Sequence, residues 1–298
     1  MVRGLTAGLA GVCAGLGQPG PTEQLRIGES ELEVTFGGGQ FDLSRPQVLD
    51  WVNQSANAVA RYFGRFPVPK ARLTILSREG RQGVSGGRTW GDHGAHTRIS
   101  IGEHTTVMGL KRDWVLTHEF VHYSFPDMPE RHHWIEEGMA TYVEPIARAG
   151  VGTLDPAVAW FEMVRDMPQG QPKSGDEGLD NTHTWGRTYW GGAIFCLLAD
   201  VAIRKNTKNT KGLREALRGI LAAGGNIEVE WPLERALEAG DKAVGGTALM
   251  SLYARMGGKA EAVDLPSLWK ELGIDRQGDA AIFDDRAPLA AIRKAILS

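Results

Sequence analysis

The chain has 298 residues, of which 42% are hydrophobic and 23% are charged, and its formal net charge is −3. These values are typical of a soluble globular protein and give no indication of a nucleic-acid or anionic-membrane partner. The sequence contains no apolar run near the roughly 20 residues that a membrane-spanning helix requires, so we expect no membrane span. The length allows one large domain or two small ones, each with its own hydrophobic core.

The first 20 residues predict a signal peptide or, as the alternative, a flexible N-terminus. Arg3 precedes a weakly apolar run over residues 5–16, a Gly/Pro break follows, and the small residues around Cys13 fit a cleavage site. We therefore expect a periplasmic or secreted protein, with a cytoplasmic one as the alternative. Cys196 is the second cysteine, and its apolar neighbours predict a buried side chain.

Periodicity in the first half of the chain predicts a small sheet and one long helix. Alternating apolar residues indicate strands at 31–36, 71–77 and 97–102. Ser44, two residues before a proline, indicates the start of a helix that covers residues 47–66.

The second half of the chain predicts mainly helices. The expected helices cover 155–166, 187–205, 211–223, 232–239, 246–256 and 287–296, and 278–283 is expected to be a late strand or a loop. The whole pattern predicts an α+β fold over residues 21–298 in a single domain. A small mixed sheet belongs to an N-terminal lobe that ends at about residue 145, and a mostly helical C-terminal lobe follows.

The strongest chemical signal lies within residues 113–144, which contain the sequence HEFVH. On a helix, residues four apart share a face, so His118 and His122 can hold one metal ion between them. Glu119 lies beside that face, where it is placed to act as a general base on a water molecule. Asp113 is expected to cap the same helix.

Catalytic zinc usually has three protein ligands and one open position, and Glu137 is the best candidate for the third ligand. It follows His122 by 15 residues, which allows a turn and a return on a second helix. Gly138 removes side-chain bulk next to it and so suits close approach of the two helices. Glu144 lies two turns further along the same face, where it is expected to accept a hydrogen bond from a zinc-bound histidine.

Other residues compete for the metal but fit less well. Glu136 points about 100° away from Glu137 around a helix. His132 and His133 do not match the HExxHxxGxxH pattern, which would need glycine at 125 and histidine at 128, so we expect them at the rim of the site or on its substrate side. The histidines of the glycine-rich stretch before residue 97 are expected to be solvent-exposed loop residues, namely His93 and His96.

HEFVH followed by WIEEGMATYVE resembles the gluzincin metallopeptidases, especially the aminopeptidase N and glycyl aminopeptidase families. Their pattern is HExxH, then W-x-x-E-G on the next helix, then an acidic residue seven positions later, and it is matched by Trp134, Glu137, Gly138 and Glu144. The later segment RTYWGGAIFCLL is similar to the family's Y-x-K-G segment. The resemblance therefore implies that Tyr189 donates a hydrogen bond to the oxyanion.

Three features depart from the family pattern. Gly191 occupies the lysine position of Y-x-K-G, and the connector between His122 and the third ligand has 14 residues, shorter than in aminopeptidase N. No G-x-M-E-N segment is present, so the family's means of holding a substrate amino terminus is missing. The glycine-rich SGGRTWG at 85–91 is a candidate for the same edge-strand position, with Asp92 as its only carboxylate.

The resemblance implies a zincin-like fold, one Zn²⁺ ion and hydrolysis of a peptide or protein substrate, with Glu119 as the general base. The segment before Tyr189 is polar and aromatic, and we expect His183 and Arg187 to contact substrate. A structural ion pair is the alternative for Arg187. Two other functions remain open, a zinc-holding binding protein without turnover and a metallohydrolase of a non-peptide amide or ester.

Overall fold

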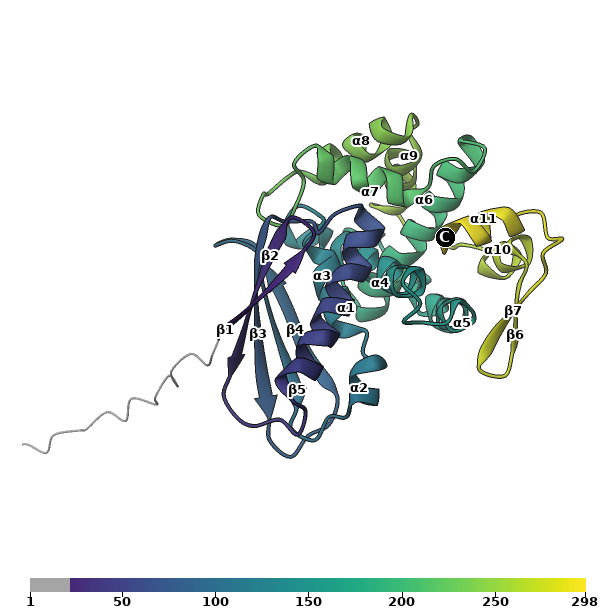
Figure 1. The fold of residues 1–298 in the computed structure, drawn as a ribbon. Coiled ribbons are helices and arrows are strands. Elements are labelled where there is room, and N and C mark those ends of the chain that lie inside the picture. Colours follow the sequence, from purple (N-terminus) through teal and green to yellow (C-terminus); the bar gives the residue numbers. More distant parts are fainter. Residues whose placement is uncertain (1–21) are drawn as a thin grey trace, which may run out of the picture.

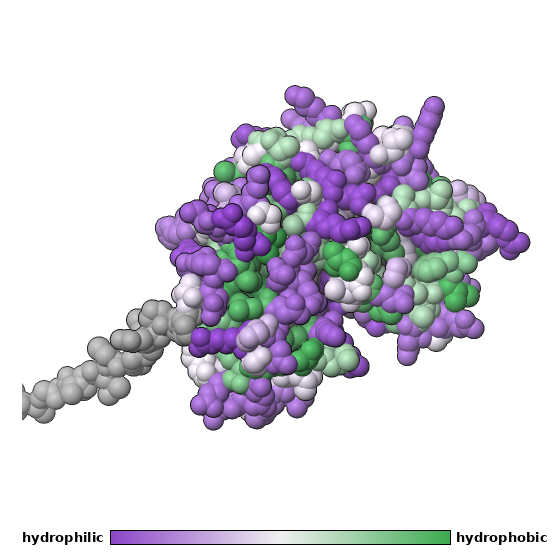
Figure 2. Space-filling view, viewed as in Figure 1, coloured by the Kyte–Doolittle hydropathy of each residue, from purple (hydrophilic) through white to green (hydrophobic). Residues whose placement is uncertain are grey.

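The computed structural model describes residues 22–298, so the predicted signal peptide at 1–20 lies outside the described residues. The described chain forms a five-stranded sheet and a series of helices (Figure 1). Hydrophilic residues cover most of the face shown in Figure 2, with smaller hydrophobic patches between them. Across these residues, every helix is too short or too polar to cross a membrane.

The sheet is mixed, and its strands lie in the order β1–β2–β3–β5–β4. β2, β3 and β5 are parallel to one another, whereas each outer strand is antiparallel to its neighbour. Leu32, Val34, Leu73 and Ile75 alternate along β2 and β3 and are fully buried, because they form the core side of the sheet. The strands are β1 (Thr22–Ile27), β2 (Ser30–Gly37), β3 (Lys70–Arg78), β4 (Val84–Trp90) and β5 (His96–Gly102).

The long helix α1 (Arg45–Phe63) connects β2 to β3 and packs against α3 and α4 (Figure 1). Its start is confirmed, because the backbone N–H of Ser44 donates to the side chain of Gln47 at 2.9 Å in a capping box. The helix ends three residues before the expected end at 66. Gly64 adopts a left-handed conformation with φ of 82°, which terminates the helix there.

The two outer strands, β1 and β4, were not predicted by periodicity. β4 has no regular alternation because Gly86 and Gly87 interrupt it, and its register with β5 shifts between Ser85 and Arg88. Both strands lie at the edges of the sheet, where fewer side chains need to be buried and the apolar signal is weak. The edge-strand position suggested by the resemblance for 85–91 is the one that β4 occupies.

The helices α3 (Val115–His122) and α4 (His133–Gly150) lie side by side and are joined through a short 3₁₀ turn at Glu130–His132. Gly138 of α4 has a different partner from the one expected. A Cβ atom at this position would clash with Gly192 of α6, so the glycine allows α4 to approach α6 rather than α3. α4 runs through residue 145, so the expected lobe boundary falls inside a helix.

The rest of the chain is mostly helical, as expected. The helix predicted at 187–205 begins with one π-helical turn at Arg187–Gly191. The late strand is confirmed as β7, which pairs with an unpredicted β6, and Cys196 is buried as predicted. The remaining elements are α2 (Val107–Lys111), α5 (Pro156–Asp166), α6 (Gly192–Asn206), α7 (Leu213–Ala222), α8 (Leu233–Val244), α9 (Ala248–Met256), α10 (Leu265–Leu272), β6 (Ile274–Gln277), β7 (Ala280–Phe283) and α11 (Ala290–Ile296).

Candidate metal centre

The helix α3 presents its two histidines on one face. As predicted, Asp113 caps this helix, because its carboxylate accepts the backbone N–H groups of Val115 at 3.0 Å and Leu116 at 3.1 Å. His118 and His122 then lie one turn apart, with ring centroids separated by 5.0 Å. The cap and the buried apolar face of α3 therefore fix the position of both imidazoles.

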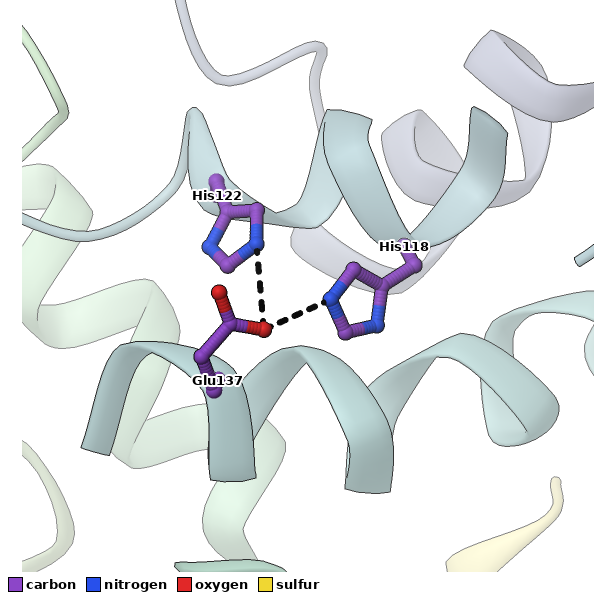
Figure 3. Close-up of side chains that lie close together, drawn as sticks. All are labelled: His118, His122 and Glu137. Atoms are coloured by element: carbon purple, nitrogen blue, oxygen red, sulfur yellow. Dashed lines mark hydrogen bonds and ion pairs between the residues drawn. The ribbon is translucent and has the colours of Figure 1, made fainter. Parts of the chain in front are cut away.

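Glu137 of α4 points at these two histidines (Figure 3). Its Oε2 lies 3.0 Å from Nε2 of His118 and 3.8 Å from Nε2 of His122, and the three ligand atoms all lie within 4.8 Å of one another. Burial alone would raise the pKa of Glu137, but the imidazoles of His122 and His118 outweigh it and lower the pKa to about 2. The carboxylate is therefore ionised at neutral pH.

These three side chains fit a zinc ion. Zinc in a tetrahedral site lies about 2.0–2.1 Å from nitrogen and oxygen ligands, which places the ligand atoms about 3.3 Å from one another. The separations of 3.0 and 3.8 Å between Glu137 and the two imidazoles lie on either side of that value. Two neutral nitrogens and one carboxylate also match the donors that zinc accepts in catalytic sites, with a fourth position left for water.

Glu119 is buried beside this cluster and is held from the opposite side by β4. Thr89 donates a hydrogen bond to Oε2 of Glu119 at 2.7 Å. A Cβ atom at Gly87 would clash with Oε1, so only glycine lets β4 pack this closely. Burial raises the pKa of Glu119, although the nearby His122 and the Thr89 hydroxyl counteract this effect.

The Thr89 hydroxyl belongs to a buried chain of hydroxyl groups. Its Oγ1 lies 2.8 Å from Oγ1 of Thr97, which in turn lies 2.7 Å from the hydroxyl of Tyr123. Both Thr97 and Tyr123 are fully buried. This chain of hydroxyls was not predicted from the sequence, because Thr89 lies in a glycine-rich stretch and the three residues come from two strands and the end of α3.

Tyr189 lies in the π-helical turn and stacks on His118, with ring centroids 6.3 Å apart and planes 18° apart. Burial and the neighbouring Glu137 carboxylate raise the pKa of Tyr189 to about 12. The phenol therefore remains protonated at neutral pH and keeps a hydrogen to donate. The resemblance placed Tyr189 at the site, and the structure brings it there.

Glu144 requires a correction. It accepts a hydrogen bond from Arg148 at 2.8 Å, not from a histidine. Within residues 22–298, Nδ1 of His118 is buried and has no hydrogen-bond partner. Arg148 lies four residues later on the same helix and carries a full charge, so it competes successfully for the carboxylate. Burial raises the pKa of Glu144 to about 7.

A second correction concerns Arg187. Its side chain is buried, its Nε lies 2.7 Å from Asp176, and its Nη1 donates to the carbonyl of Gly170 at 2.6 Å. These contacts contradict the prediction that Arg187 binds substrate, and they match the structural ion pair that was its alternative. His183 is exposed near the start of the π-helical turn, and its contact with substrate stays a prediction.

His132 is buried and does not lie at the rim as expected. Its Nδ1 lies 2.8 Å from Asp180, which also accepts hydrogen bonds from Trp134 and Tyr253, each at 2.8 Å. This network attaches the segment before Tyr189 to the start of α4. His133 does lie beside the cluster, with Nε2 3.3 Å from Oε1 of Glu137.

The two loop histidines differ from each other. His93 is exposed, as expected. His96 lies in β5, where Nε2 is 2.9 Å from the hydroxyl of Thr74 and the ring lies against Trp90, so the prediction of an exposed loop residue was wrong. Glu136 does not belong to the metal cluster, and its carboxylate instead accepts the backbone N–H of Met128 and contacts His133.

A recess of about 570 Å³ adjoins the cluster. We call it the α4 recess, because residues of α4 line it from Thr141 to Arg148. His118 and Tyr189 also line it, so it is continuous with the candidate metal centre. This recess was not predicted from the sequence, since its walls come from segments that are distant in the chain.

No protein-family model matches the sequence, and no curated protein shows a significant sequence match. Solved structures do match the fold. An aminopeptidase N family protein from Idiomarina loihiensis has a TM-score of 0.64 at 11% identity, over 85% of this chain and 49% of that one. A mutant M1 zinc metallopeptidase from Deinococcus radiodurans has a TM-score of 0.51 at 16% identity, over 83% and 53%.

Aminopeptidase A from Legionella pneumophila, solved in complex with aspartic acid, has a TM-score of 0.53 at 11% identity, over 82% of this chain and 28% of that one. At such identities the likeness shows the fold alone. The chain therefore shares a fold with zinc metallopeptidases of the M1 type, and it spans about half or less of the length of these proteins.

Proposed function

We propose that the protein is a zinc-dependent peptidase. The observation that carries this proposal is the convergence of His118, His122 and Glu137, with the carboxylate of Glu119 and the phenol of Tyr189 beside them. The structural neighbours support it, because each is named as a zinc metallopeptidase or an aminopeptidase. Action outside the cytoplasm is a further part of the proposal and depends on residues 1–20 alone.

Each residue has a definite role in this proposal. His118, His122 and Glu137 would hold one zinc ion, which supplies Lewis-acid chemistry by lowering the pKa of water and polarising a carbonyl group. Glu119 accepts the proton of the attacking water and returns it to the leaving amine. Tyr189 donates a hydrogen bond to the developing oxyanion, and one such donor contributes about 3 kcal/mol to catalysis.

The position of β4 supports a peptide substrate. β4 is the last strand in the sheet order, and among the described strands it pairs only with β5. It packs directly on Glu119 through Gly87 and Thr89. An extended peptide that pairs with the free edge of such a strand receives main-chain hydrogen bonds regardless of its sequence, and a scissile bond would then lie close to the general base.

Digestion of a peptide library, followed by mass spectrometry, tests the proposal. The zinc-loaded protein is expected to cleave peptides, and a chelator is expected to abolish cleavage. Glu119→Gln should retain about one zinc ion per chain but lower kcat by roughly 100-fold or more. Glu136→Gln is a matched control, because this neighbouring carboxylate does not belong to the cluster and bonds to Met128 and His133.

Two results would contradict the proposal. Undiminished cleavage by Glu119→Gln would show that another group is the base. Stoichiometric zinc without cleavage of any peptide would favour the zinc-holding binding protein or the hydrolase of a non-peptide amide or ester, and a screen of model esters would separate these two.

A further inference from the structure

The α4 recess begins at the candidate metal centre and extends along one face of α4. Thr141, Glu144, Pro145 and Arg148 follow the metal ligand Glu137 by 4, 7, 8 and 11 residues, which is the spacing of a single helix face. The part of α4 that lines the recess runs from Thr141 to Arg148, a stretch of helix that spans roughly 10 Å. The recess is therefore an elongated space that starts where a scissile bond would lie.

Indole rings form its walls near the metal centre. Trp114 precedes α3 and lies edge-on to His118 at 5.6 Å, and Trp185 stacks on Tyr189 at 5.6 Å with ring planes 25° apart. These two tryptophans are 51% and 59% exposed. They are two of the six large hydrophobic side chains that are exposed in the described part of the chain, and both lie at this recess.

Four of the eight charged side chains that line the recess form two ion pairs, and Lys111, Arg112, Asp155 and Glu162 are the other four. Glu144 contacts Arg148 at 2.8 Å, and Asp166 contacts Arg165 at 2.5 Å. An ionised ligand would have to compete with these partners, whereas a neutral ring would not. The binding free energy at exposed indole faces is more favourable for a flat aromatic ligand than for a small one, because aromatic rings stack and remove a large apolar area from water.

We propose that the α4 recess binds an aromatic side chain of the substrate, from one of the two residues that flank the scissile bond. This proposal rests on the proposed peptidase function for its link to hydrolysis. Binding of the ring itself depends only on the recess. The volume of about 570 Å³ lies in the range of ordinary ligand pockets, so it has room for a phenol or an indole.

The first experiment compares peptide substrates that differ only at the residues flanking the scissile bond. Phenylalanine, tyrosine or tryptophan at one of these two positions is expected to raise kcat/KM at least about tenfold over alanine. Equal rates for aromatic residues and alanine at both positions would overturn the proposal while leaving the peptidase function intact.

The second experiment measures binding without turnover. Zinc-loaded Glu119→Gln is titrated with a blocked pentapeptide that has a central phenylalanine and with its alanine counterpart, and tryptophan fluorescence or calorimetry reports the affinity. The phenylalanine peptide is expected to bind at least about tenfold more tightly. Adding Trp185→Ala should lower the ratio of the two affinities about fivefold, whereas Trp185→Phe should keep most of this preference because a ring is still present.

Ile282→Ala is the surface control, since this residue is exposed on β7 and does not line the recess. A preference for the aromatic peptide that survives both Trp185→Ala and Trp114→Ala would overturn the proposal. If no peptide is hydrolysed but the tryptophan-dependent preference is found, the proposed catalysis fails and the aromatic site stands.

Discussion

The carboxylate of Glu119 depends on a residue of the sheet for its orientation. A carboxylate can only accept hydrogen bonds, so the three hydroxyls in line with it can each donate toward it, from Tyr123 to Thr97, then to Thr89, then to Glu119. Such a chain fixes the oxygen that Thr89 contacts. Rigid placement matters because a general base must lie within hydrogen-bond distance of the proton that it removes.

Replacing Thr89 with valine tests this positioning role. Thr89→Val keeps the shape of the side chain but removes the hydroxyl, and we expect kcat to fall about tenfold or more, because a hydrogen bond to a charged group contributes about 1.5–3 kcal/mol. KM and zinc content should change little. Thr89→Ser restores the hydroxyl and should recover most of kcat. An unchanged kcat in Thr89→Val would show that the hydrogen bond has no role in catalysis.

The raised pKa of Glu144 predicts that the stability of the protein depends on pH. Its pKa is about 7 in the folded protein and about 4.5 when unfolded, so the folded state holds the proton more tightly. The free energy of unfolding should therefore decrease as pH rises from about 4.5 to about 7 and show no further contribution from this group above that interval. A shift of this size corresponds to at most about 3 kcal/mol.

Urea unfolding at pH 5 and pH 8, with saturating zinc, measures this effect. Glu144→Gln cannot titrate, so it should lose less stability between the two pH values than the wild type does. Zinc binding has its own pH dependence, but it is common to both proteins and cancels in the comparison. Equal losses of stability in the two proteins would contradict the raised pKa.

At the scale of elements, α4 carries the third metal ligand and is held by two neighbours. α3 lies on the side of Glu137, and α6 lies against Gly138 through a crossing at Gly192. Both residues at this crossing are glycines, which have no side chain, so the two backbones approach closely. The position of the carboxylate of Glu137 therefore depends on both helix contacts.

Gly138→Ala tests the α4–α6 crossing. The added methyl group has no room beside Gly192, so we expect the unfolding free energy to fall by about 1–3 kcal/mol and zinc affinity to fall as α4 shifts. Gly246→Ala is the control, because a Cβ atom there meets nothing within 4 Å. Denaturant unfolding and zinc titration measure the two effects. If Gly138→Ala had the same unfolding free energy and the same zinc affinity as Gly246→Ala, the close crossing would be contradicted.

Local sequence signals predicted some elements well and others poorly. Ser44 and Asp113 marked the starts of α1 and α3 correctly, because caps are satisfied by contacts within a few residues. β4 was not predicted from its pattern, since Gly86 and Gly87 interrupt it. Gly87 follows from the close packing of β4 on Glu119, which Thr89 contacts across 30 residues of chain, and Gly86 follows from its φ of 62°, a backbone conformation that favours glycine.

At the scale of the whole molecule, the candidate site combines four segments that are far apart in sequence. Spacing along the chain predicted the face shared by the two histidines and Glu137 as the best third ligand, and the resemblance supplied Tyr189. The hydrogen-bond partners were not predictable in the same way. Glu144 and Arg187 each found a charged partner in the fold, and only the three-dimensional packing decides between such a partner and a metal or substrate contact.

Metal content is the measurement that tests the central claim most directly. Protein purified without chelator, supplied with zinc and then dialysed, should contain about one zinc ion per chain by mass spectrometry. Glu137→Ala should lose most of this zinc, whereas Glu136→Ala should keep it, because Glu137 belongs to the cluster with the two histidines and Glu136 does not. A wild type that binds no zinc, or a Glu137→Ala variant that binds it as tightly as the wild type, would contradict the account.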